Sequence, residues 1–137
     1  MYDWVLYMNN TNIPPNANVP NLIVVNTPFV PGYRIVEIKG FVWGLIVRSR
    51  GLGGNIVANL RSIVGGEIDE YTKLLDETRH MALNRLIISA TNLGANAVVS
   101  VNFDSTELVN YMTEILAYGT AVVVEKETKE SQSVKLT

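Results

Sequence analysis

The segment with the strongest chemical signature joins two arginines to a glycine-rich turn. Residues 48–55 read Arg-Ser-Arg-Gly-Leu-Gly-Gly-Asn, and apolar residues at helical spacing follow them. Asn55 therefore stands where a helix N-cap is expected, so the turn would offer backbone amides, a helix dipole and the charges of Arg48 and Arg50 to an anion. The alternative, which we favour, is that the glycines only permit a tight turn while both arginines pair with acids across a subunit boundary.

Two aromatic residues form a second candidate site. Trp43 and Tyr118 lie in segments rich in strand-forming residues and could stack on a flat ligand. Packing at a subunit interface is the simpler interpretation, because Trp and Tyr are common interface anchors. With Arg48, Arg50 and Asn55 they make up our candidate ligand-binding residues, and the ligand would be a small molecule, anionic if the arginines take part.

Neither a metal site nor a catalytic centre is predicted. The chain has no cysteine and four scattered methionines, and its one histidine, His80, falls on the polar face of a predicted helix, whereas soft metals need clustered ligands. Asp104, Glu107 and Glu114 could hold a hard cation, but they lack the spacing of a calcium loop. Ligands converging at the axis of a ring would be the exception. With no Gly-x-Ser-x-Gly elbow, we expect no enzyme activity and no cofactor.

Composition indicates a single globular domain. The 137 residues are 47% hydrophobic and 18% charged, which suits one hydrophobic core rather than a disordered chain. A net charge of −2 argues against a protein that grips nucleic acid phosphates. The longest apolar run, 41–47, is far shorter than the roughly 20 residues that span a bilayer, and the first residues do not resemble a signal peptide. We therefore expect a cytoplasmic protein with neither nucleic acid nor membrane as a partner.

Pro, Gly and Asn residues, which interrupt helices and strands, divide the chain into predicted elements. In order, these are an extended, Asn- and Pro-rich arm (1–21), a short strand (22–25), a long strand (33–47), a short helix (55–64), an amphipathic helix that has Glu67, Asp69 and Glu70 in its first turn and ends before Gly94, strands 97–103 and 114–125, and a polar tail (126–137). Thr78, Ala82 and Leu86 mark the apolar face of the amphipathic helix. Gly94 is placed to end it. The order predicts one sheet with its helices on one face.

Both faces of that sheet are apolar. Alternation in the long strand places Val36, Ile38, Val42 and Ile46 on one face and Ile35, Phe41, Trp43, Leu45 and Val47 on the other. In the last strand Ala117, Gly119 and Ala121 form a small-residue face that suits close helix packing, and Leu116, Tyr118 and Val122 point the other way. The helices cover only one face. A second copy of the chain is the simplest cover for the other, which predicts a homo-oligomer.

Five ordered runs give the chain a resemblance to the YbjQ-like family of bacterial and archaeal proteins. They are GFVWG (40–44), VRSRG (47–51), IVGGE (63–67), LGANAV (93–98) and AYGTAV (117–122). The resemblance spans residues 22–125 and implies an α+β, dodecin-like βαββ subunit, with an antiparallel sheet and helices on one face. It also implies assembly into a ring, most often a pentamer, and the family carries a heavy-metal-binding label without an accepted catalytic mechanism.

The expected function follows from both lines of argument. We expect a homo-oligomer, as a pentamer if the resemblance holds, that binds a small ligand or partner at its intersubunit surfaces. A purely structural oligomer, whose arm recruits a partner, and a metal-handling protein are the alternatives.

Overall fold

The computed structural model describes residues 21–49, 69–108 and 112–128, which form one helix and four strands. The elements are β1 (Ile23–Val24), β2 (Tyr33–Ser49), α3 (Asp69–Asn92), β3 (Ala97–Glu107) and β4 (Met112–Lys126). Each predicted strand and the amphipathic helix are therefore present, and β3 continues past its predicted end. The arm up to residue 20, the short helix 55–64 and the tail beyond residue 128 lie outside the described residues.

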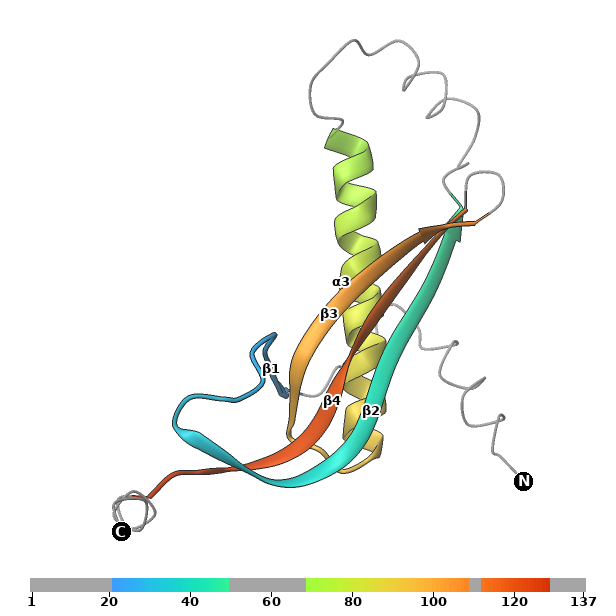
Figure 1. Ribbon diagram of the computed structural model, residues 1–137. Helices are drawn as coiled ribbons and strands as arrows, with labels where there is room; N and C mark the ends of the chain where they lie inside the picture. Colours follow the sequence, from blue (N-terminus) through green and yellow to red (C-terminus); the bar gives the residue numbers. More distant parts are fainter. Residues whose placement is uncertain (1–20, 50–68, 109–111, 129–137) are drawn as a thin grey trace, which may run out of the picture.

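The four strands form a mixed sheet in the order β1-β3-β4-β2 (Figure 1). β4 runs antiparallel to both of its neighbours, but β1 pairs with β3 in parallel. The prediction of a purely antiparallel sheet is therefore wrong at this edge. A two-residue strand has no pattern that reports its direction; its backbone bonds decide it, with Ile23 N–H donating to Asn96 O and Val25 N–H to Val98 O.

Helix α3 covers one face of the sheet, and it lies behind the strands in Figure 1. Thr78, Ala82 and Leu86 are buried along it, as their spacing predicted. Gly94 ends the helix at a φ of +84°, with its N–H donating to Thr91 O, which confirms its predicted role. Ala117 and Ala121, from the small-residue face of β4, belong to the same buried core as Ala82, Leu86 and Ala90 of the helix. In the described part of the chain no helix is long and apolar enough to cross a membrane.

Two bulges in β2 change the predicted faces of the residues that lie between them. The pairing with β4 shifts between Ile35 and Glu37 and again between Ile38 and Gly40. Ile38 pairs with Val122, so it lies on the face of Phe41 and not, as predicted, with Val42. Val36 and Ile38 are accordingly exposed, whereas Val42 and Ile46 are buried under α3. The predicted alternation holds beyond the bulges and also at Ile35, which pairs with Val124 on the face of Phe41; it fails only between the two bulges.

The face turned away from α3, here called the open face, is partly covered by the chain itself. The segment between β1 and β2 folds over it, and Val30 is buried among Val99, Val122 and Val124. This cover reaches only one end of the sheet. The far half of the open face, on β2 and β4, carries larger side chains that remain half-buried or exposed.

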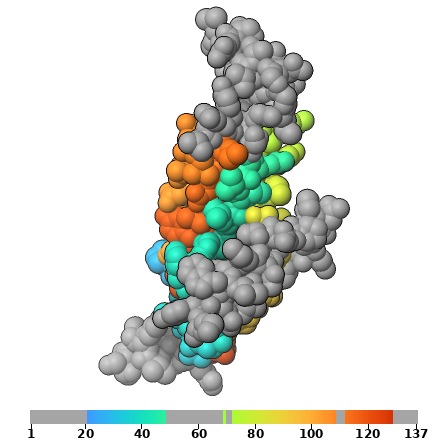
Figure 2. All heavy atoms as spheres, turned by 90° about the vertical axis from the view of Figure 1, so that its right-hand side faces the viewer, coloured from blue at the N-terminus to red at the C-terminus, as the bar shows by residue number. Residues whose placement is uncertain are grey.

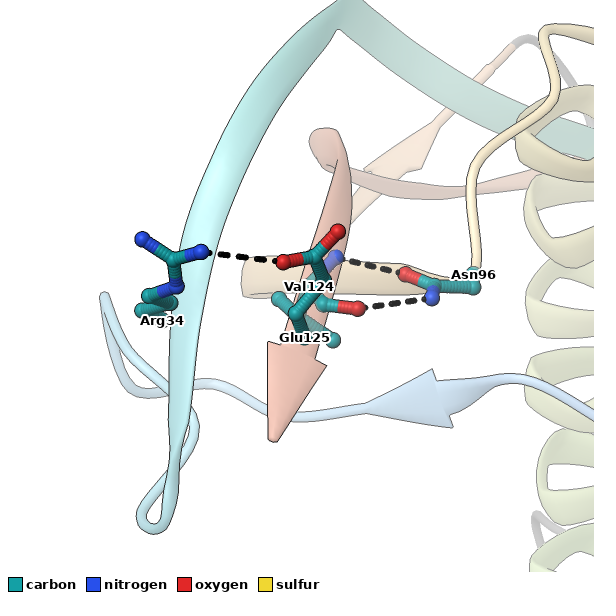
Figure 3. A network of polar contacts seen from close by, with 4 residues as sticks. All are labelled: Arg34, Asn96, Val124 and Glu125. Carbon is teal, nitrogen blue, oxygen red and sulfur yellow. Dashed lines mark hydrogen bonds and ion pairs between the residues drawn. The ribbon is translucent and has the colours of Figure 1, made fainter. Parts of the chain in front are cut away.

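Asn96 binds the backbone of β4 beside that core through two hydrogen bonds (Figure 3). Its side-chain amide donates to Val124 O at 2.9 Å, and its side-chain oxygen accepts from Val124 N–H at 2.8 Å. Here the chain turns from α3 into β3, so the side chain supplies hydrogen bonds that the strand itself cannot. On the other side of β4, Arg34 and Glu125 form an exposed ion pair at 3.1 Å.

Candidate functional site

Three aromatic side chains gather on the open face. Trp43 and Tyr118 are direct partners in the pairing of β2 with β4. Phe41 lies next to both, with ring centroids 5.7 Å from Trp43 and 6.1 Å from Tyr118. We call these three residues the aromatic platform. The structure therefore brings together two of the five predicted ligand-binding residues and adds a third ring.

The surface around the platform changes character from strand to strand. On β2 it is apolar, with Phe41 62% and Val47 48% exposed. On β3 it is polar, because Asn102 stands opposite Tyr118 and Asp104 opposite Leu116. The open face therefore has an apolar side along the β2 edge and a polar side along β3. A flat apolar group would find its contacts on the β2 side.

Helix α3 holds the β2 side of the platform in place from behind. Figure 2, which faces the β2 edge of the sheet, shows β2 with α3 beside it. Arg85 donates to the carbonyl oxygen of Leu45 at 2.5 Å, and Ser89 to that of Trp43 at 3.4 Å. Burial lowers the pKa of Arg85, but an arginine stays protonated in proteins, so the bond is charge-assisted.

Arg48 does not share this site. It pairs with Thr113 on the face covered by α3, opposite to the face of Trp43. Its Nη1 is buried without a hydrogen-bond partner, and the nearest acid is Glu77, with Oε2 3.8 Å away. Within one chain Arg48 therefore lies near an acid, and its pairing across a subunit boundary stays a prediction. Arg50 and Asn55 lie outside the described residues.

The placement of Arg48 predicts that its removal changes little. We expect Arg48→Met to alter the free energy of unfolding by less than about 1 kcal/mol, because a partly exposed ion pair contributes roughly 0–1 kcal/mol and the Nη1 group is unbonded. Urea denaturation measures this change. Phosphate should raise the Tm of the variant as much as that of the wild type, with Glu77→Gln as the matched control. If phosphate no longer raised the Tm of Arg48→Met but still raised that of Glu77→Gln, Arg48 would be shown to bind the anion after all.

The remaining candidate ligands do not converge. Glu107 lies on the α3 side of the sheet, whereas Asp104 and Glu114 lie on the open face. Within residues 21–49, 69–108 and 112–128, no three His, Asp or Glu side chains group as a metal site would require. His80 is exposed on α3, with Nδ1 2.8 Å from the carbonyl oxygen of Asp76.

Phe41 is the residue that the sequence analysis missed. It was placed on the same face as Trp43 but was not named as a candidate. Alternation alone could have found it, since it stands two residues before Trp43 with no bulge between them.

Comparisons with known proteins agree on one family. The model of a family described as "Putative heavy-metal-binding" matches residues 22–125. The chain is 58% identical over 118 residues to the UPF0145 protein of Methanocella arvoryzae, covering 86% of this chain and 98% of that protein. It is also 58% identical over 106 residues to a UPF0145 protein of Bradyrhizobium sp., covering 77% of this chain and 96% of that protein.

A solved structure shares the fold. It is that of a protein of unknown function of the DUF74 family from Pediococcus pentosaceus, with a TM-score of 0.55, 16% identity and coverage of 76% of this chain and 98% of that one. At this identity the likeness concerns the fold alone, and it matches the α+β arrangement of one helix on a four-stranded mixed sheet.

Proposed function

The chain belongs to the YbjQ-like, UPF0145 family, and we propose that it is a homo-oligomeric binding protein whose subunits form a ring, as the resemblance to this family implies. In this proposal a neighbouring copy covers the free half of the open face, and a small ligand or partner is held at the intersubunit surface beside the aromatic platform. The observation that carries the proposal is the apolar surface of β2 on the open face.

That surface is large for a face left in water. Its members share one side of β2 and β4 and are exposed or half-buried: Ile38, Phe41, Trp43, Leu45, Val47, Leu116 and Tyr118. Burying one large apolar side chain is worth about 1.5–3 kcal/mol. Several of them together supply enough free energy to offset the cost of bringing two copies together. Rows of exposed apolar side chains of this kind mark interfaces more often than free surfaces.

The shape of the face favours a ring over a two-fold dimer. Its apolar side follows the β2 edge, while the β3 side is polar, so the two edges of one subunit differ. Contacts between unlike surfaces run head to tail, and they close into a ring when the rotation between neighbouring copies divides a full turn evenly. The pentamer that the family resemblance implies is one such closed form. A binding role, rather than catalysis, suits a site built from rings and aliphatic side chains.

Charge placed on the platform tests the proposal. We expect native mass spectrometry of the untagged wild type to show a single oligomer, and Phe41→Asp to shift it to monomer. Phe41 is exposed in the subunit, so the variant should keep its far-UV circular dichroism. Leu93→Asp is the matched control, because Leu93 is 46% exposed but directly follows α3, which covers the opposite face of the sheet. A monomeric wild type, or an oligomer that persists in Phe41→Asp, would contradict the proposal.

A further inference from the structure

We propose that residues 1–20 of one copy dock on the aromatic platform of the next copy, with their prolines against the rings of Phe41, Trp43 and Tyr118. The inference rests on the proposed oligomer. It adds the identity of the occupant: a proline-rich segment of the same chain.

The chemistry of the two partners matches. The platform is a cluster of three rings in contact, on a strand that carries no charged residue between Lys39 and Arg48. Residues 4–20 are also without charge and contain Pro14, Pro15 and Pro20. Aromatic surfaces recognise proline-rich segments because these are extended before they bind, so little entropy is lost on docking. Because neither surface carries a charge, docking has no free-energy cost of desolvating a charged group.

The positions of the two partners allow a contact between copies. The described chain begins at Asn21, next to β1 at one edge of the sheet, while the platform lies on β4 and β2 at the opposite edge. Between them on the open face lies the segment that buries Val30. A donor at one edge and a receptor at the other repeat head to tail. Reach sets no limit, since twenty extended residues span about 60 Å and the sheet is only about 15 Å wide.

The proposed contact joins a segment outside the family match to a surface inside it. The family model begins at residue 22, so the proposed donor segment lies before the matched region, while the receptor lies within it. The proposal therefore concerns a contact of this chain, formed by a segment that the family match does not include.

Engineered disulfides in the full chain test the contact, because the sequence contains no cysteine. The test variant is Ile13→Cys/Thr120→Cys, since Thr120 stands opposite Phe41 at the edge of the platform. In a glutathione redox buffer, we expect a ladder of covalent oligomers on a denaturing gel, ending at the subunit number that native mass spectrometry gives. The matched control, Ile13→Cys/Lys73→Cys, uses an exposed position on the outer side of α3 and should form at least about tenfold less ladder.

A second comparison tests whether the prolines of residues 1–20 contribute to the contact. Adding Pro14→Ala and Pro15→Ala to the test variant should slow ladder formation about tenfold while leaving the native stoichiometry unchanged. An oligomer whose ladder is no stronger than that of the control would overturn the inference but leave the proposed function standing. A mass loss of 2 Da without a ladder would place the segment on its own copy and also overturn it. A monomeric wild type would remove the proposed function itself.

Discussion

Replacing Gly44 by alanine is expected to lower the free energy of unfolding by about 3 kcal/mol, the upper end for overpacking a core. Gly44 lies where β2 touches the backbone of α3. A Cβ atom there would fall 2.5 Å from the amide nitrogen of Leu86 and 2.9 Å from Cβ of Arg85, and against the carbonyl oxygen of Ala82. These atoms belong to the helix or stand directly on it, so the whole helix would have to move. Urea denaturation of both proteins measures the difference.

The same displacement should disturb the candidate site. Arg85 and Ser89 reach the carbonyl oxygens of Leu45 and Trp43, on either side of Gly44, only because the helix lies so close. We therefore expect the emission of Trp43 to shift in any folded fraction of Gly44→Ala; Trp4→Phe removes the second tryptophan of the chain.

A second glycine distinguishes the cost of steric crowding from the cost of an unfavourable backbone conformation. Gly32 has a φ of +77°, but a Cβ atom there would meet nothing within 4 Å. Gly32→Ala should therefore cost only the roughly 1–2 kcal/mol of a left-handed alanine. Equal losses in the two variants would mean that the close approach of α3 to β2 is not a constraint.

Removing the side chain of Asn96 is expected to cost about 2 kcal/mol. Asn96→Ala would leave both the N–H and the carbonyl oxygen of Val124 without their partner, and Val124 is buried. Each buried polar group left unsatisfied costs roughly 1–3 kcal/mol. Asn102→Ala is the matched control, because the Asn102 side chain makes one exposed bond, to Ser100 O. It should change stability by less than about 0.5 kcal/mol.

An isosteric change at the same position gives a prediction that depends on pH. Asn96→Asp keeps the acceptor for Val124 N–H but turns a carboxylate oxygen toward Val124 O. That contact favours the protonated form, so the pKa of the introduced carboxyl should be higher in the folded than in the unfolded chain. Its stabilising contribution is then present at low pH and is lost as the pH rises through the folded value. The deficit of Asn96→Asp relative to wild type should shrink as the pH falls toward about 4, which parallel denaturation series would show; a constant deficit would contradict the bond assignment.

Local pattern determined the elements of this protein. The amphipathic spacing in 69–92 and the strand-forming runs before and after it were sufficient to predict α3, β2 and β4, because helix and strand periods are properties of neighbouring residues. Gly94 was likewise predictable as the end of the helix, since few residues adopt its positive φ. The small-residue face of β4 correctly indicated where the helix packs.

The tertiary structure alone decided what the elements bring together. The bulges that move Ile38 to the open face depend on pairing with β4, and no pattern within β2 reports them. The parallel direction of β1 depends on bonds to residues more than seventy positions away. Arg48 and Trp43 are five residues apart and were both named as candidate ligand-binding residues, yet odd spacing in a strand places them on opposite faces. Phe41 joins the platform for the same reason: contacts across strands, not distance along the chain, assemble the site.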